Sequence, residues 1–312
     1  MSKTLTSHTV IITKAQSKRI REYLVDRGFV ISTPQYTLFS AKGPDLVVSS
    51  YESGKLLLQG KGTREFIEFY LEPQILEKAT VGYELEHDPE QLKPHIGVDE
   101  SGKGDFFGPL VITAAYLNEP AARILHESGV QDSKNVKSAA KIQELCKIIE
   151  KTDGCVVDTV CIGNPAYNKL YKKFANLNRL LAWGHARAIE NVLAKINTEL
   201  PGPEFVLSDQ FAKSKSVVEK ALFGKAKSIQ LIQKTKAESD IAVATASICA
   251  RGKFVSEMDR LSEKLGVKLP KGASKQVFMA AQEVLKQGEI GNLESVCKRH
   301  FKTYQEVVDS IE

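Results

Sequence analysis

Short apolar runs separated by turn residues dominate the first 80 residues of the chain. Helical spacing predicts one helix over 14–27 and a second over 63–71. Between them, runs rich in β-branched and aromatic residues predict strands at 29–33, 36–41, 45–51 and 55–60. Glycine and proline residues separate these runs, and the last two strands are expected to form a hairpin. The pattern therefore predicts a small α+β domain with an antiparallel meander.

Strand and helix patterns alternate through the rest of the chain. The runs HIGVDE and PLVITAAYL flank a glycine-rich segment and predict two strands joined by a tight connection. Further helices are expected at 121–127, 138–150, 176–197 and 240–258, and further strands at 155–162, 204–209 and 228–233. This alternation predicts an α/β fold built in layers.

An acidic stretch with two prolines divides the two regions. It holds Glu84, Glu86, Asp88 and Glu90, and it interrupts the apolar pattern. We therefore expect three parts: a small N-terminal α+β domain at 1–80, a linker at 81–94 and a larger α/β domain at 95–312.

The composition is that of an ordinary globular protein. The chain has 312 residues, of which 42% are hydrophobic and 26% are charged, so disorder and collagen-like structure are excluded. No apolar run is long enough to span a bilayer, and the first residues lack the pattern of a signal peptide. The 5 cysteines are scattered, without a CxxC pair. We expect a soluble cytoplasmic protein with free thiols, no membrane association and no zinc site.

Positive charge is concentrated in parts of the chain. The net charge is +5, and lysine-rich blocks occur at 213–236 and 251–275, with a smaller basic excess in 1–80. Such blocks suit a polyanion such as nucleic acid. A solvated, lysine-rich helix face is the alternative that charge alone leaves open.

Four acids stand at the ends of predicted elements. Asp99 and Glu100 close one apolar strand, Asp209 closes another, and Asp240 opens a helix. Asp209 could instead start a turn, and Asp240 could serve only as an acid at a helix N-terminus. Successive strand residues point to opposite faces, so Asp99 and Glu100 meet at one site only if the strand twists or ends there.

Clustered carboxylates are suited to hard divalent cations. Two such ions held about 3.5–4 Å apart can activate water and stabilise a leaving alkoxide in phosphodiester hydrolysis. Oxygen ligands favour Mg²⁺, and Mn²⁺ also fits. The four acids therefore predict a nuclease site that uses Mg²⁺ or Mn²⁺, with two ions expected.

A glycine-rich turn follows the adjacent acids. Gly102, Lys103 and Gly104 match neither a P-loop nor a dinucleotide-binding fingerprint. Glycine lets a backbone approach a ligand closely and present its amides, so this turn could follow a sugar-phosphate strand while Lys103 meets phosphate. Contacts of this kind can read a 2′-hydroxyl, which distinguishes RNA from DNA.

These residues carry a resemblance to a known family. The strings GVDESGKGDFFGPLV, GVQDSKNV, NPAYNKLY, NLNRLLAWGHARAI, LSDQF, AESDIAVATASICAR, LPKGAS and HFKTY closely resemble bacterial ribonuclease HIII, of the type 2 ribonuclease H group. The match covers residues 95–305. The segment YESGKLLLQGKGT resembles the appended domain of the family, which is similar to the TATA-binding-protein fold and helps to bind substrate.

The resemblance implies a fold, an activity and a set of residues. It implies an RNase H-like fold and endonucleolytic cleavage of the RNA strand of RNA/DNA hybrids, leaving 5′-phosphate and 3′-hydroxyl ends. It assigns catalysis and metal binding to Asp99, Glu100, Asp209 and Asp240. It assigns substrate binding to Ser101, Gly102, Lys103 and Gly104 and to Asp132, Ser133 and Lys134, although Asp132 could merely cap a helix. Because type HII members usually have arginine in place of Lys103, this lysine favours HIII.

Histidines and aromatic residues offer further candidates. His185 lies in an apolar helix, where packing is the favoured interpretation over general-base catalysis. His300 has basic neighbours that fit either phosphate contact or packing, and Trp183 is expected in the core. Tyr167 and Tyr171, close to lysines, fit either base stacking or packing.

Three classes of function remain open. The first is a metal-dependent nuclease acting on RNA/DNA hybrids, with no obligate protein partner and a monomeric state. The second is a nuclease or resolvase directed at DNA, against which the glycine-rich turn weighs. The third is a catalytically silent nucleic-acid-binding protein, which the complete acidic set disfavours because unpaired carboxylates repel phosphate.

Overall fold

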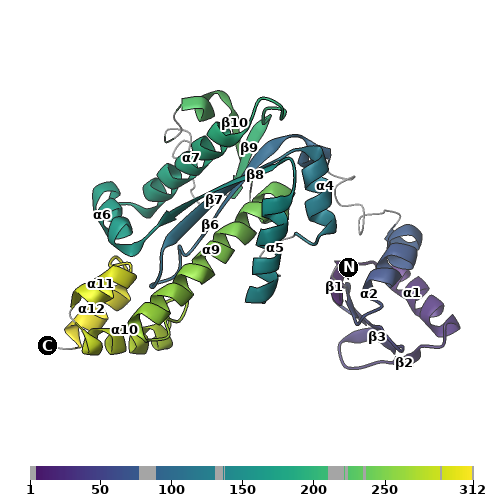
Figure 1. Cartoon of the computed structure of the whole chain (residues 1–312). Coiled ribbons are helices and arrows are strands. Elements are labelled where there is room, and N and C mark those ends of the chain that lie inside the picture. Colours follow the sequence, from purple (N-terminus) through teal and green to yellow (C-terminus); the bar gives the residue numbers. More distant parts are fainter. Residues whose placement is uncertain are drawn as a thin grey trace. The chain divides into compact units, whose positions relative to one another are not determined.

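Each of the two regions of the chain builds its own five-stranded sheet (Figure 1). The computed structural model describes residues 5–76, 89–130, 136, 138–209, 221, 224–234, 237–288 and 290–310. The chain divides into two compact units, Met1–Pro89 and Glu90–Glu312. Most of the expected linker at 81–94 lies outside the described residues, so its extent stays a prediction.

The N-terminal unit is an antiparallel sheet with helices. Its elements are β1 (Ser7–Ile11), α1 (Lys14–Asp26), β2 (Val30–Ser32), β3 (Thr37–Lys42), β4 (Val47–Tyr51), β5 (Lys55–Gln59), α2 (Thr63–Phe66) and a π-helix (Ile67–Leu76). The strand order is β1-β5-β4-β3-β2, and every pair is antiparallel. The meander and its last hairpin are confirmed. Strand β1 was missed, and the second helix continues beyond 71 as a π-helix.

Alternation of buried and exposed residues explains this sheet. Phe39, Val48, Leu56 and Leu58 are fully or almost fully buried on strands β3 to β5. They form one cluster with Leu24 of α1, so the helix covers the apolar face of the sheet. The α+β class of this unit is therefore confirmed.

The C-terminal unit is a mixed sheet covered by helices. Its elements are a 3₁₀ turn (Pro89–Leu92), β6 (His95–Ser101), β7 (Leu110–Leu117), α4 (Glu119–Glu127), α5 (Ala139–Lys151), β8 (Cys155–Ile162), α6 (Asn164–Phe174), α7 (Leu177–Lys195), β9 (Phe205–Asp209), a 3₁₀ turn (Gly224–Ser228), β10 (Gln230–Lys234), a 3₁₀ turn (Ala237–Ser239), α9 (Ile241–Leu265), α10 (Lys275–Gln287), α11 (Ile290–Val296) and α12 (Lys302–Asp309). The strand order is β10-β9-β6-β7-β8. Strands β10, β9 and β6 pair in parallel, whereas β7 pairs antiparallel with both of its neighbours, β6 and β8. The α/β prediction is confirmed.

Two long helices cover opposite faces of this sheet (Figure 1). Ile96 and Val98 of β6 pack in the same cluster as α7. Gly97 points the other way, because a Cβ atom there would lie 2.2 Å from the backbone of Ala242 and Val243 in α9. Glycine thus lets α9 approach the middle of β6, and the two faces of this strand look toward different helices.

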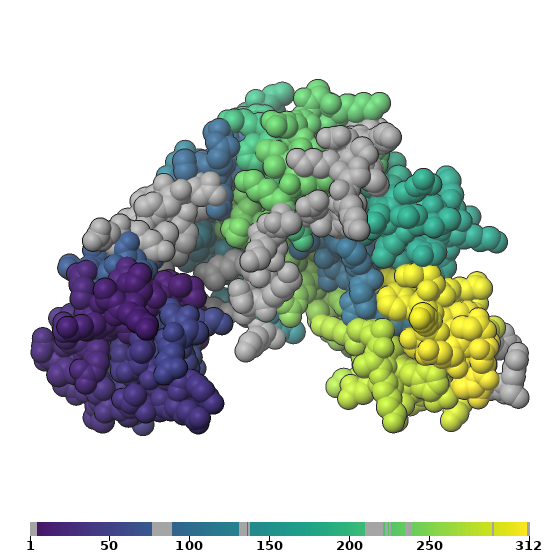
Figure 2. Space-filling model, turned by 180° about the vertical axis from the view of Figure 1, so that it is seen from behind, coloured from purple at the N-terminus to yellow at the C-terminus, as the bar shows by residue number. Residues whose placement is uncertain are grey.

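The C-terminal helices form a second apolar cluster. Val277, Leu293 and Val307, from α10, α11 and α12, pack together with Phe106, Phe107 and Phe254. Figure 2 shows the yellow α11–α12 region beside the teal segment that contains α6, and α11 contacts α6. The sequence pattern did not predict α6, α10, α11 or α12. None of the described helices is long and apolar enough to cross a membrane.

Candidate active site

Asp99 and Asp209 end neighbouring parallel strands. In the register of β6 with β9, Val98 lies opposite Ser208, so the next residues along, Asp99 and Asp209, are neighbours. Adjacent strands are about 4.8 Å apart, and residues of equal parity share a face. Leu207 of β9 packs against Val243 of α9, which identifies that face as the one covered by α9. The fold therefore brings two predicted acids together at one edge of the sheet.

Glu100 points toward the other face. Its Oε2 accepts a hydrogen bond from His185 Nε2 of α7 at 3.0 Å. Asp99 instead accepts a hydrogen bond from Ser247 of α9. The strand alternation expected for Asp99 and Glu100 is thus present, and the two carboxylates leave opposite faces of β6 close to its end at Ser101.

The two adjacent carboxylates influence each other electrostatically. Burial, followed by the negative charge of Glu100, raises the pKa of Asp99 to about 7. Burial would also raise the pKa of Glu100, but the hydrogen bond from His185 and the charge of Lys103 outweigh it and lower this pKa. A cation at this edge would relieve the repulsion and favour the charged form of Asp99. Oxygen donors with unrelieved negative charge fit a hard divalent ion.

The glycine-rich turn follows these acids directly. Lys103 Nζ lies 3.3 Å from Glu100 Oε1. Gly102 has a φ of 86°, and a Cβ atom there would lie 2.2 Å from the carbonyl oxygen of Pro109, so only glycine fits. Gly104 is exposed, and a Cβ atom there would meet nothing within 4 Å. The turn thus places an open backbone and a lysine next to the acids, as its sequence predicts.

Asp240 occupies a different place. It is the N-cap of α9, where its Oδ1 accepts hydrogen bonds from the amides of Ala242 and Val243 at 2.9 and 3.0 Å. Both carboxylate oxygens also lie 3.1 Å from His95 Nε2. His95 begins β6, four residues before Asp99, which corresponds to about 13 Å along a strand. The described contacts of Asp240 are therefore those of a helix cap and a buried pair.

The contact with Asp240 favours the charged form of His95. Its Nδ1 donates to the carbonyl oxygen of Lys93 at 2.7 Å, so Nε2 can donate to Asp240 only in the protonated ring. Burial disfavours that form, but the hydrogen bond and charge of Asp240 outweigh burial and raise the pKa of His95. His95 was not predicted as a functional residue; its only signal in the sequence is a histidine at the start of an apolar strand.

The remaining histidine and aromatic candidates have distinct surroundings. His185 is buried in α7, as the packing interpretation expects, but it also forms a hydrogen bond with Glu100. Trp183 packs against the core and Phe174, as expected. Tyr167 is fully buried, which removes it as a stacking platform for bases.

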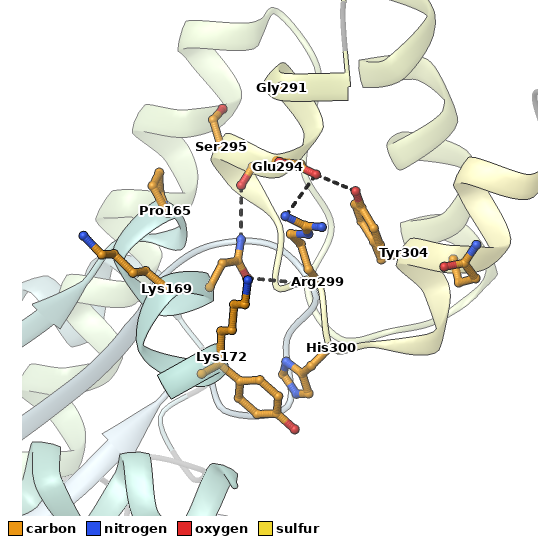
Figure 3. A pocket seen from close by; sticks show the side chains of 12 residues that line it. Pro165, Lys169, Lys172, Gly291, Glu294, Ser295, Arg299, His300 and Tyr304 are labelled. Atoms are coloured by element: carbon orange, nitrogen blue, oxygen red, sulfur yellow. Dashed lines mark hydrogen bonds and ion pairs between the residues drawn. The ribbon is translucent and has the colours of Figure 1, made fainter. Parts of the chain in front are cut away.

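Tyr171 and His300 line a pocket between α6 and the segment from α11 to α12 (Figure 3). Their rings stack at 4.3 Å, and the cavity has a volume of about 850 Å³. Lys169, Lys172 and Arg299 also line it, with Arg299 3.3 Å from Glu294. Burial and the charge of Lys298 lower the pKa of His300. The pocket thus combines basic and aromatic groups, and Tyr171 and His300 pack on each other at its wall.

Two sets of candidates need separate mention. Asp132, Ser133 and Lys134 lie outside the described residues. Among the residues that the structure does describe, no three side chains of His, Cys, Asp or Glu are already gathered around one metal position. Asp99, Glu100 and Asp209 are therefore neighbours at one edge rather than a closed cage.

Comparison with known proteins places this fold and site. The Ribonuclease HII family matches residues 96–304, and a domain of unknown function, DUF3378, matches residues 8–81. Ribonuclease HIII of Chlamydia pneumoniae is 46% identical over 96% of this chain and 97% of its own length. Ribonuclease HIII of Chlamydia felis is 45% identical over 93% of this chain and 94% of its own.

Solved structures show the same relationship. The crystal structure of Bst-RNase HIII in complex with Mn²⁺ has a TM-score of 0.66 and 28% identity, covering 98% of this chain and 99% of that one. Aquifex aeolicus RNase H3 has a TM-score of 0.53 and 30% identity, covering 93% of this chain and 98% of that one. The fold and its acidic edge define an RNase H-like endonuclease, a phosphodiester hydrolase. Within that class, the chain belongs to the ribonuclease HIII family.

The pair of His95 and Asp240 leads to a prediction about stability and pH. Because the pKa of His95 is raised in the folded state, the pair stabilises fully below the ordinary histidine pKa of about 6.5 and is lost as pH rises through the raised value. Asp240→Asn keeps a capping oxygen but removes the charge. We expect it to lower the free energy of unfolding by about 1–3 kcal/mol at a pH near 6, and by less at a pH near 9.

Urea unfolding of both proteins at the two pH values measures this difference. Asp153→Asn, which changes an exposed carboxylate, is the control and should show no such trend. A loss of stability in Asp240→Asn that is equal at both pH values would contradict the charged pair.

Proposed function

We propose that this chain hydrolyses the RNA strand of RNA/DNA hybrids with the help of divalent cations, leaving 5′-phosphate and 3′-hydroxyl ends. The observation that carries the proposal is the parallel register that makes Asp99 and Asp209 neighbours, with Glu100 and the glycine-rich turn immediately beyond. Its membership of the ribonuclease HIII family, and the Mn²⁺ in the Bst-RNase HIII crystal structure, support the same chemistry.

Two Mg²⁺ or Mn²⁺ ions, when bound, would supply an activated water and stabilisation of the leaving oxygen. Asp99, Glu100 and Asp209 would hold them through carboxylate oxygens. Ser247 and His185 keep Asp99 and Glu100 in place from the two faces of the sheet. Lys103, which lies beside Glu100 here, would turn to the phosphate of the substrate.

Asp240 is the fourth acid of this proposal. Its carboxylate already accepts hydrogen bonds from His95 and from the helix amides, and a metal ion would share its remaining acceptor sites.

We propose that the N-terminal unit is an accessory binding surface for the substrate. We also propose that the protein acts as a monomer in the cytoplasm. The basic excess of residues 1–80 supports the first part, because lysine and arginine neutralise phosphates. The DSK segment, Asp132 to Lys134, is proposed to contact the hybrid on the strength of the family resemblance.

Cleavage of matched duplexes tests the substrate. RNA/DNA hybrid should be cut with Mg²⁺ or Mn²⁺ but not with chelator, and RNA and DNA duplexes should be spared. Cleavage rates should rise in the order one, two, four and twelve ribonucleotides among otherwise identical duplexes. Each missing 2′-hydroxyl leaves one hydrogen-bonding group of the protein without its partner, at a free-energy cost of about 1–3 kcal/mol. Equal rates on one and twelve ribonucleotides would show that the turn does not read a run of riboses.

Neutral variants of the acids test the metal site. Asp99→Asn, Glu100→Gln and Asp209→Asn should each lower hybrid cleavage by about 100-fold or more, because a lost ligand misplaces the reacting groups. A comparable loss in the same assay of Asp240→Asn would identify Asp240 as the fourth acid. Circular dichroism controls for folding. Near-normal turnover of Asp99→Asn at saturating Mg²⁺ would rule out the proposed site.

Removal of the N-terminal unit tests its role. A chain that begins near residue 89 should bind hybrid more weakly than the full chain, and the logarithm of its affinity should depend less steeply on the logarithm of salt concentration. Fluorescence anisotropy over a salt series measures both quantities. Identical affinity and identical slope would refute an accessory binding surface.

A further inference from the structure

Lys298 is a lysine without exposed surface. It follows α11 in the short segment before α12, and its relative exposure is 0%. Burying an ammonium group is unfavourable unless hydrogen bonds replace the lost water. The position of this side chain therefore needs an explanation that packing alone does not give.

The hydrogen bonds of Lys298 are concentrated on one loop. Its Nζ donates to the carbonyl oxygens of Asp105 at 2.8 Å and Gly108 at 2.6 Å, and lies 3.5 Å from that of Phe107. An ammonium has three donors, and here they face three carbonyls of one turn. The backbone adds to this, since Lys298 N donates to the carbonyl oxygen of Phe106 at 2.8 Å.

This loop is the continuation of the glycine-rich turn. The amide of Asp105 donates to the carbonyl oxygen of Gly102 at 3.3 Å, and Gly102 is packed against the carbonyl oxygen of Pro109. Gly272 also holds this loop, because its amide donates a hydrogen bond to Asp105 Oδ1 at 2.6 Å. Lys298 thus fixes residues 105–108, the segment that directly follows Lys103 and Gly104.

We propose that Lys298 is a positioning residue that holds the glycine-rich turn in the position in which it binds the substrate. It acts through the carbonyl groups of residues 105–108, and it touches neither the acids nor the exposed side of the turn. The inference rests on the proposed function in one respect, namely that the glycine-rich turn contacts the hybrid.

The surroundings agree with a role set by geometry rather than by an ion pair. Burial lowers the pKa of Lys298 to about 7, against the opposing charge of Asp105. The carboxylate of Asp105 faces Gly272, and the Tyr167 ring lies 5.6 Å from Nζ. Carbonyl groups are therefore the direct partners of this nitrogen, and a methionine of similar length would fill the space without donating to them.

The test measures binding of hybrid separately from binding of metal. Full-length Lys298→Met is expected to bind an RNA/DNA hybrid about tenfold more weakly in chelator, as judged by anisotropy, because the turn loses its fixed position. Calorimetric binding of Mn²⁺ should stay within about twofold of wild type, because the acids keep their own partners. The KM for hybrid should rise while kcat stays within about threefold.

Lys286→Met is the matched control, since Lys286 is an exposed lysine of α10 in the same C-terminal region, and its affinity for hybrid should be unchanged. If Lys298→Met does not fold, Lys298→Gln takes its place with the same expectation of weaker hybrid binding. A folded variant that binds hybrid as tightly as wild type overturns the inference. Wild-type protein that binds hybrid but does not cut it would instead refute the proposed function and leave this measurement intact.

Discussion

The parallel pairing of β6 with β9 is the constraint on which the candidate site depends. It aligns two segments more than 100 residues apart so that Asp99 and Asp209 end side by side. Each strand is held by apolar residues that face a helix, such as Val98 and Leu207. Because hydrophobic burial fixes which residues face which side, a slip of one residue would turn either acid to the wrong face.

The site is held from two sides that differ in chemistry. On one side, α9 comes close to β6 at Gly97 and brings Ser247 to Asp99. On the other, α7 brings His185 to Glu100. Both contacts satisfy carboxylates that would otherwise repel each other unrelieved, and the raised pKa of Asp99 shows that repulsion remains. The fold thus holds two carboxylates that repel each other, and a divalent cation would relieve this repulsion.

Hydrogen bonds connect the C-terminal region of the chain to the loop beside the acidic edge of the sheet. Lys298 and Gly272 fasten the loop that follows the glycine-rich turn, although they come from segments far along the chain. The pocket lined by Tyr171 and His300 lies beside this region, where Asn164 of α6 also donates to the carbonyl oxygen of Gly108. The geometry of the turn is therefore set by three separate segments.

Local sequence patterns are enough to predict the α/β and α+β classes, most strands, and the places of Asp99, Glu100, Asp209 and the glycine-rich turn at strand ends. These follow from local alternation and from turn residues, which act within a few positions of the chain. The helices α6 and α10 to α12 were missed from the sequence.

Which of the acids lie together depends on contacts between distant parts of the chain. It places Asp240 on His95 rather than beside Asp99, gives His185 a carboxylate partner, and buries Lys298 against carbonyl groups. Each of these depends on a partner 85 or more positions away. A polar side chain takes the donor or acceptor that folding brings to it, and local sequence carries no record of that partner.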